Sequence, residues 1–232
     1  MTRQVEESAL AAMALFEGVG ATTLLAAAER ARTRLWRRAA VVFNQGDEGV
    51  RAHIVMRGAI RIVQSGSDGA LAMMRLVGPG EIFGAVALFT DGRYPADAIA
   101  MTETCEASWS EADLAALMHA DPEVAINLLR IVGARLQEAQ NRMRELGTQS
   151  AARRLAHTLV RLTRQADGQG GEVTSIAFPL RRTDIAELSG TTLYTASRLL
   201  SKWQRAGWLA SRRQRLRLLD IEAIKAVADG DR

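Results

Sequence analysis

Hydrophobic and polar positions along the chain change their periodicity twice. Over residues 8–34 apolar side chains recur at roughly helical spacing, and a Gly-Val-Gly break at residues 18–20 predicts two short helices. Over residues 41–109 short apolar and β-branched runs alternate with polar residues, and turn signals such as residues 78–80 recur about every 8–12 residues. Frequent turns between short strands predict a small antiparallel β-barrel or sandwich rather than a parallel sheet with crossover helices.

Residues 121–146 are expected to form one long helix. Asp121 can cap its first free N–H groups, and Pro122 suits the first helical position. Apolar residues then recur at alternating steps of four and three, which is the seam of a two-helix coiled coil. Such a seam needs a partner, either the β domain or, more economically for a helix with charged residues beside the seam, its own copy in a parallel dimer. The expected dimerisation residues are Leu129, Val132, Leu136, Ala139 and Met143.

Beyond this helix the pattern breaks into shorter elements. Residues 147–150 predict a hinge, and residues 151–162 predict a further amphipathic helix. Residues 165–171 predict a loop, and residues 178–180 a short strand at a sheet edge.

Charge is unevenly distributed along the chain. The sequence has 30 Lys plus Arg and 26 Asp plus Glu, a net charge of +4. Residues 1–146 hold 15 basic and 18 acidic side chains, net −3, whereas residues 147–232 hold 15 basic and 8 acidic side chains, net +7. This asymmetry predicts a polyanionic partner for the C-terminal part, and nucleic acid is the commonest one; an incidental basic surface is the alternative.

Residues 182–209 carry the pattern of two helices joined by a tight turn. Gly190 suits the corner between the helices. Thr183 is expected to cap the first helix, and Thr191 or Thr192 the second. Apolar residues at matching positions face inward from both helices: Ile185, Leu188, Ala196, Leu199 and Leu200. This pattern predicts a helix-turn-helix.

The second of these helices presents polar side chains on its outer face, where a recognition helix meets the major groove. Arg198 is expected to bind guanine O6 and N7, the alternative being an ion pair with Asp184 or Glu187. A hairpin with four arginines follows within residues 207–218 and is expected to act as a wing on the phosphates. The expected DNA-binding residues are Thr191, Thr192, Tyr194, Thr195, Ser197, Arg198, Lys202, Arg212, Arg213 and Arg215.

Three segments carry a resemblance to a known family: residues 43–47 (Phe-Asn-Gln-Gly-Asp), 78–84 (Gly-Pro-Gly-Glu-Ile-Phe-Gly) and 190–198 (Gly-Thr-Thr-Leu-Tyr-Thr-Ala-Ser-Arg). Over about residues 14–225 the chain resembles the CRP/FNR family of bacterial transcription regulators. The resemblance implies an α+β chain of three parts, which are an N-terminal antiparallel β-roll sensor domain of the cyclic-nucleotide-binding, jelly-roll type (1–120), a long dimerisation helix (121–146) and a C-terminal winged helix-turn-helix (147–232). It also implies a homodimer on palindromic double-stranded DNA, an effector in the β-roll that repositions the DNA-binding heads, and RNA polymerase as a partner.

The effector expected from the resemblance is not cAMP. Cyclic-nucleotide binders of the family have a Glu for the ribose where this chain has Ala85, and an Arg followed by Ser or Thr for the phosphate where it has Pro95 and Ala96. A buried phosphate without its charge partner is costly, so cAMP binding would need Arg93 to substitute from a shifted loop. Arg93 and Tyr94 either line the effector pocket or finish a hairpin against the dimer helix. The expected pocket residues are Phe83, Gly84, Ala85, Arg93 and Tyr94.

Residues 191–198, together with Tyr-Pro-Ala at residues 94–96, are most similar to the branch of the family that regulates denitrification in response to nitric oxide or nitrogen oxides. This resemblance implies haem-dependent sensing. A metal ligand cannot be assigned from the residues themselves, because His53, His119 and His157 lie far apart and each is interpreted as structural or surface.

Cys105 is the one cysteine, which excludes an intramolecular disulfide and any zinc or iron–sulfur site built on a cysteine cluster. It shares an expected strand face with Ala107 and Trp109 and is predicted to be buried, with redox or nitric-oxide sensing as the alternative. A reducing cytoplasm is the expected compartment, because no signal peptide or membrane-spanning segment is predicted.

The motifs are compatible with two functions for this chain. An enzyme is not expected, because the chain has no phosphate-binding loop, nucleophile elbow or zinc-protease motif. The first function is a homodimeric transcription regulator that couples a signal in the β-roll to DNA binding. The alternative is a β-roll small-molecule-binding protein whose basic C-terminal head binds protein.

Overall fold

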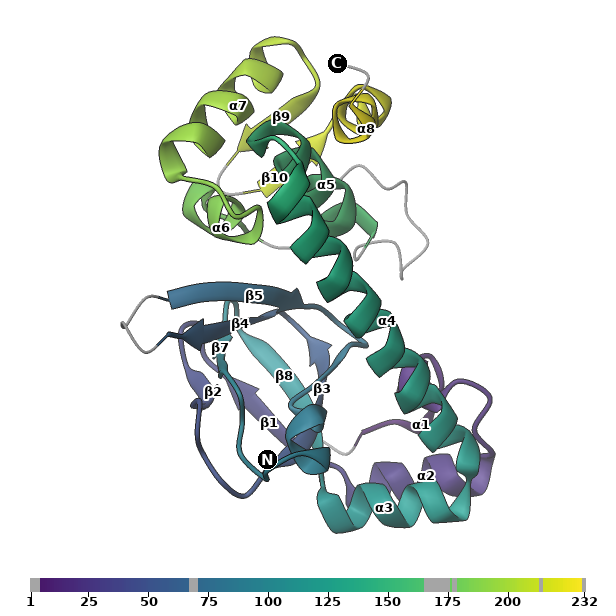
Figure 1. Ribbon diagram of the computed structural model, residues 1–232. Coiled ribbons are helices and arrows are strands. Elements are labelled where there is room, and N and C mark those ends of the chain that lie inside the picture. The colour runs from purple at the N-terminus through teal and green to yellow at the C-terminus, as the bar shows by residue number, and fades with distance from the viewer. Residues whose placement is uncertain (1–4, 67–70, 165–175, 177–178, 213–214, 231–232) are drawn as a thin grey trace. The chain divides into compact units, whose positions relative to one another are not determined.

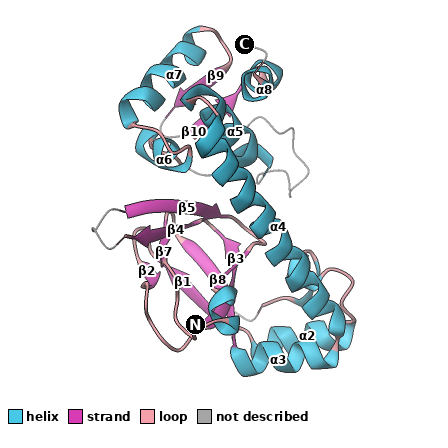
Figure 2. Cartoon of the chain, viewed as in Figure 1, coloured by secondary structure: helices cyan, strands magenta, loops and turns pink. Residues whose placement is uncertain are grey.

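The computed structural model describes residues 5–66, 71–164, 176, 179–212 and 215–230 (Figure 1). It divides into two compact units, residues 1–138 and 139–232. The first unit holds a β-sandwich and helices, and the second is mostly helical with one small hairpin (Figure 2). Among the described residues, no helix is long and apolar enough to cross a membrane.

Two four-stranded antiparallel sheets form the core of the first unit, with strand orders β1-β8-β3-β6 and β2-β7-β4-β5. The strands are β1 (Arg32–Trp36), β2 (Val41–Phe43), β3 (Arg51–Arg57), β4 (Ile60–Ser65), β5 (Leu71–Val77), β6 (Ile82–Phe83), β7 (Asp97–Ala100) and β8 (Thr104–Ser110). The predicted antiparallel β architecture and α+β class are confirmed.

The first strand begins earlier than the sequence pattern predicted. β1 pairs with the edge of β8, from Arg32 opposite Ser108 to Trp36 opposite Thr104. Its side chains are exposed or half-buried throughout, so β1 lacks the apolar alternation that marks a strand with one buried face.

Short helices complete the first unit: α1 (Glu7–Ala11), the 3₁₀ turn η1 (Ala14–Phe16), α2 (Ala21–Arg30), the 3₁₀ turn η2 (Ala85–Phe89) and α3 (Glu111–Ala120). The expected division at residues 18–20 is confirmed, because α2 begins directly after Gly20. The pattern did not predict α3, which begins with a capping box in which Ser110 accepts from the backbone N–H of Asp113. Trp109 anchors the core beside these helices, packing edge to face on Phe16 and donating to the carbonyl of Ala27 at 2.8 Å.

Helix α4 (Pro122–Thr148) follows α3 and uses one face to dock on the first unit. Val124 and Leu128 are buried in that unit's core, and the Asn127 side chain donates to the carbonyls of Leu15 and Glu17. The seam faces elsewhere: Leu129 is 71% exposed and Leu136 60% exposed. Packing of the seam on the β domain, one of the two interpretations of its pattern, is therefore wrong.

The second unit contains the C-terminal end of α4, then α5 (Ala151–Arg164), α6 (Arg182–Leu188), α7 (Leu193–Arg205), β9 (Leu209–Arg212), β10 (Arg215–Leu218) and α8 (Ile221–Asp229). The expected hinge at residues 147–150 is too long, because Gly147 and Thr148 continue α4 and only residues 149 and 150 separate it from α5. The whole of the predicted loop at 165–171 and Phe178 of the predicted edge strand lie outside the described residues, and Pro179 and Leu180 belong to no regular element.

Candidate nucleic-acid interface and effector cavity

Helices α6 and α7 form the predicted helix-turn-helix. Thr183 does not cap α6, because the helix begins at Arg182 and Thr183 lies in its first turn. The buried Asp184 carboxylate takes that role: it accepts from the backbone N–H of Arg181 at 2.7 Å and pairs with the Arg181 guanidinium at 3.1 Å. This charged acceptor one residue later satisfies the free N–H better than a hydroxyl would.

A glycine is required at the corner between the two helices. Gly190 has a φ of +59°, and a Cβ there would lie 2.4 Å from the Leu146 Cδ2 of α4. Thr192 then caps α7 by accepting from the backbone N–H of Thr195 at 3.2 Å, as predicted.

Helix α7 separates an apolar inner face from a polar outer one. Ala196, Leu200 and Trp203 are buried on the inner face. Tyr194 is 78% exposed, and Arg198 is exposed on the same helix. Arg198 does not neutralise Asp184, whose carboxylate pairs with Arg181. The remaining expected contact residues are exposed or half-buried: Thr191, Thr192, Thr195, Ser197 and Lys202.

The wing consists of β9 and β10, which pair antiparallel from Arg212 opposite Arg215 to Leu209 opposite Leu218. Leu216 and Leu218 are buried, while Arg212, Arg215 and Arg217 are exposed. Alternation along β10 therefore aims the arginines at solvent. Arg213, the other expected wing residue, lies outside the described residues.

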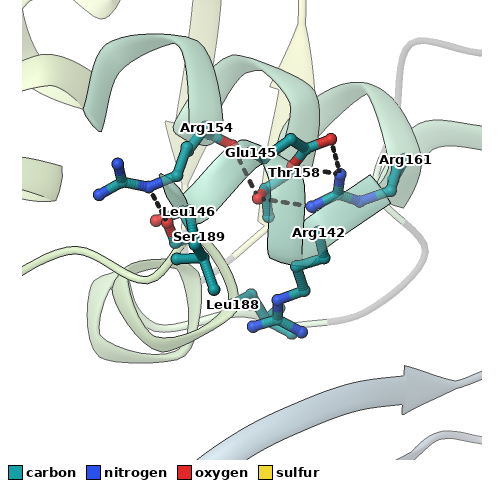
Figure 3. A pocket seen from close by; sticks show the side chains of 8 residues that line it. All are labelled: Arg142, Glu145, Leu146, Arg154, Thr158, Arg161, Leu188 and Ser189. Atoms are coloured by element: carbon teal, nitrogen blue, oxygen red, sulfur yellow. Dashed lines mark hydrogen bonds and ion pairs between the residues drawn. The ribbon is translucent and has the colours of Figure 1, made fainter. Parts of the chain in front are cut away.

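Hydrogen bonds and an ion pair join helices α4 and α5 to each other and to the turn of the helix-turn-helix (Figure 3). Arg154 of α5 donates to the carbonyls of Ser189 and Gly190 in the turn of the motif, at 3.1 and 2.9 Å. Arg161 donates to both carboxylate oxygens of the buried Glu145 of α4 at 3.0 Å. The described side chains leave no room for a water molecule at this junction. The last turns of α4 are thus part of the helix-turn-helix unit.

The first unit contains a cavity of about 140 Å³ in its β-roll. Three aromatic residues line it, Phe43, Phe83 and Tyr94, together with Gly84, Pro95 and Ala96. The structure thus brings together Phe83, Gly84 and Tyr94 of the five expected pocket residues. Ala85 is buried in η2 but is not in the lining. Arg93 is exposed and pairs with Glu48 at the surface.

Tyr94 is fixed on the cavity wall by packing and hydrogen bonds. Its ring stacks on Phe43 with the centroids 3.6 Å apart, and its hydroxyl accepts from the Arg51 backbone N–H at 2.8 Å. The hydroxyl also lies 2.9 Å from Nε2 of His53, whose Nδ1 lies 2.5 Å from the buried Glu106 carboxylate. Burial raises the pKa of Tyr94 above its usual value, so the phenol stays neutral at physiological pH. Tyr94 therefore packs into the β-roll core and does not form a hairpin against the dimer helix.

Arg75 is the one charged residue among the described residues of the lining, and the sequence pattern did not single it out. It donates to the Ile82 carbonyl at 2.8 Å, and its Nη1 lies 3.6 Å from Oε2 of Glu81. Arg135 of α4 donates to the same Glu81 oxygen at 2.8 Å. Burial, and then the charge of Arg135, lower the pKa of Arg75 to about 10. A lone charge in the otherwise apolar run 71–77 was the available sequence signal.

Comparison with known proteins now identifies the two units. A cyclic nucleotide-binding domain model matches residues 33–121, and a Crp-like helix-turn-helix domain model matches residues 153–227. The cyclic AMP receptor protein of Thermus thermophilus is 32% identical over 186 residues, which cover 80% of this chain and 83% of that protein. The chain belongs to the CRP/FNR family of transcription regulators.

Other relatives of this CRP/FNR-family chain bear different names. The CRP-like cAMP-activated global transcriptional regulator of Mycobacterium tuberculosis is 25% identical over 93% of this chain and 96% of its own length. The structure of FixK2 from Bradyrhizobium japonicum matches with a TM-score of 0.74 and 25% identity over 85% of this chain and 96% of that one. The transcriptional activator FnrA of Stutzerimonas stutzeri is 28% identical over 86% of this chain and 81% of its length. These names span several branches, so they give no specific support to the nitric-oxide branch.

Haem does not fit the sites of this family member. A haem macrocycle is at least as large as the ligands that need pockets of about 300 Å³ or more, twice the volume of the cavity. Both ring nitrogens of His53 are engaged, with Glu106 and Tyr94. A larger open groove of about 610 Å³, between Gly49 and Ala115, has no His, Cys or Met among its described lining residues. Within the described part of the chain no cluster of His, Cys, Asp and Glu could hold a metal ion.

The other residues considered for signal sensing are the two remaining histidines and the cysteine. His119 lies 2.7 Å from the Ala115 carbonyl of its own helix, and His157 of the second unit contacts Gln149. Cys105 is half-buried, so its predicted burial is wrong. Its partner on the edge strand β1 is Leu35, whose side chain lies on the same face of the sheet and is 63% exposed, so this part of the face is open to solvent.

We expect the family member to take up no haem, because neither the space nor a free imidazole is present at the cavity. The purified protein, incubated with haemin and passed over a desalting column, should retain no Soret band, and nitric oxide should leave its spectrum unchanged. A stoichiometric Soret band that shifts with nitric oxide would contradict this prediction.

Proposed function

We propose that this chain is a homodimeric regulator that couples a small effector in the β-roll cavity to binding of palindromic double-stranded DNA, and that the bound dimer contacts RNA polymerase. The observation that carries the proposal is helix α7, which turns Tyr194, Arg198 and Lys202 to solvent beside an arginine wing. Residues 181–217 hold 9 basic and 2 acidic side chains, so the charge excess of the C-terminal part is concentrated on this motif.

The seam of α4 supports the dimer. Its apolar residues repeat every three and four positions over about three heptads and are exposed in the single chain, as Leu129, Leu136 and Met143 show. A coiled-coil seam of this length is stable when a second helix covers it. Two DNA-binding heads related by a two-fold axis then require a palindromic site.

The signal is a separate part of the proposal. The cavity lacks the charged residues with which the family's cyclic-nucleotide binders hold ribose and phosphate, because Ala85, Pro95 and Ala96 stand at those positions. cAMP is therefore not the proposed effector. Nitric oxide sensed through haem is also left out of the proposal, since the cavity and the histidines do not fit haem.

The test of the proposal is selection of a binding site from random double-stranded DNA, followed by gel shifts over a range of salt concentrations. We expect a palindromic consensus and an affinity that falls steeply with salt. Absence of specific binding at low salt, together with capture of a defined protein partner by the basic head, would support the alternative function instead.

Substitution of Arg198 should remove base discrimination. In Arg198→Ala we expect affinity for the selected site to fall about 30-fold or more, because the dimer loses one bidentate guanine contact of about 1–3 kcal/mol in each half-site, and the preference at one base pair of each half-site should relax. The matched control is Arg212→Ala on the wing, which should weaken binding to all DNA alike and reduce the salt dependence. Unchanged discrimination in Arg198→Ala would contradict its assignment.

A further inference from the structure

The β-roll cavity has room for one small ring. Its volume is about 140 Å³, close to that of an engineered apolar cavity of about 150 Å³ that binds benzene. Its walls are aromatic and aliphatic, with Phe43, Phe83 and Tyr94 on them. Nucleotides, like drug-sized ligands, require pockets of about 300 Å³ or more. Size and lining therefore select a single-ring ligand.

Arg75 adds an incompletely paired cation to this wall. Its Nη2 donates to the Ile82 carbonyl, but its Nη1 is buried and makes no hydrogen bond to any described residue. Oε2 of Glu81, with which Nη1 forms an ion pair, is 3.6 Å away. A buried N–H without an acceptor is costly, and the cost is greater on a charged group.

Nη1 of Arg75 lacks an acceptor because the neighbouring carboxylate is already paired. Oε2 of Glu81 accepts at 2.8 Å from Arg135, which also pairs with Glu138 at 3.2 Å. Two guanidinium groups thus compete for one carboxylate oxygen, and Arg135 holds it. The lowered pKa of Arg75 reflects the same shortage, since burial and the nearby Arg135 both oppose its charge.

We propose that the cavity binds a small aromatic monocarboxylate, of the size of benzoate, with its ring among the aromatic residues and its carboxylate on Arg75. A carboxylate matches the guanidinium fork and leaves no further charge to satisfy, whereas a phosphate dianion would leave one charge unpaired in an apolar wall. This inference rests on the proposed function, in which the cavity is the effector site.

Such a ligand acts directly on the dimer helix. When its carboxylate pairs with Arg75, the competition for Glu81 ends and the Glu81–Arg135 pair becomes exclusive. Arg135 lies next to Leu136 of the seam on α4, so occupancy of the cavity is coupled to the position of this helix.

The test is calorimetric titration of the full-length protein with sodium benzoate, with its neutral analogue benzamide and with cAMP. We expect one benzoate per chain, affinity for benzamide about tenfold or more weaker, and no heat from cAMP. In Arg75→Gln the affinity for benzoate should fall to that for benzamide, which should itself stay unchanged. The exposed Arg57→Gln is the matched control and should bind benzoate as the wild type does.

Two further variants distinguish a loss of ligand binding from a loss of folding. Ala96→Leu fills the cavity and should abolish binding of both ring compounds, whereas Arg75→Lys keeps the charge without the fork and should weaken benzoate alone. Absence of benzoate binding, equal benzoate affinity in wild type and Arg75→Gln, or binding of cAMP in its place would overturn the inference. Gel shifts with the selected DNA on the same preparations separate the two proposals, since specific DNA binding without benzoate binding refutes only the ligand.

Discussion

Glutamates at two seam positions should convert the protein to a monomer that binds the palindromic DNA site only weakly. Leu129 and Leu136 are mostly exposed in the single chain, so Leu129→Glu with Leu136→Glu leaves the fold of each chain intact. In a parallel dimer each new carboxylate faces its own copy across the seam, which replaces apolar contacts with repulsion. Loss of the second head removes the avidity of a two-site complex, so DNA affinity should fall about 10²–10⁴-fold.

Sedimentation velocity and gel shifts on the selected site check this result. The matched control carries the same two added charges, Ala134→Glu with Asn141→Glu, at exposed positions that the seam spacing places on the far side of the helix. It should remain a dimer with unchanged DNA affinity. A double seam variant that still sediments as a dimer would show that another surface joins the chains.

The parts of the fold that the sequence predicted correctly are those with a local signal. The helix-turn-helix follows from Gly190, a capping threonine and apolar positions within about twenty residues, and the structure confirms the motif. The turns between strands are equally local. β1 carries no such signal because an edge strand with mostly exposed side chains has no buried face to mark in its sequence.

The cavity could be predicted only in part, because its walls come together through strand pairing. Phe43 stacks on Tyr94, and Arg75 reaches the cavity because β5 pairs with β4. Neighbours in sequence diverge instead: Tyr94 is buried while Arg93 pairs at the surface with Glu48. Family resemblance located Phe83 and Gly84, but the residue that carries the charge in this chain stands outside the motif.

The contacts between α4, α5 and the turn of the helix-turn-helix, shown in Figure 3, could not be predicted from the sequence either. Breaking the ion pair among them should cause the largest loss of stability. Glu145 has a side chain only 8% exposed, and Arg161 donates to both of its oxygens. Arg161→Met keeps most of the packing volume but leaves the carboxylate buried without its partner. We expect the free energy of unfolding of the second unit to fall by about 3 kcal/mol, the lower end for a broken buried pair because Arg161 is 28% exposed.

Urea unfolding followed by tryptophan fluorescence measures this loss, since Trp203 and Trp208 report on the second unit. The decisive comparison is Glu145→Met with Arg161→Met, which removes both charges and should recover most of the stability that the single change loses. The exposed pair Arg57–Glu103 supplies the control, because Arg57→Met should cost less than about 0.5 kcal/mol. Equal losses in the single and double variants would mean that Arg161 stabilises the junction through packing, and that the ion pair does not join the end of α4 to the DNA-binding head.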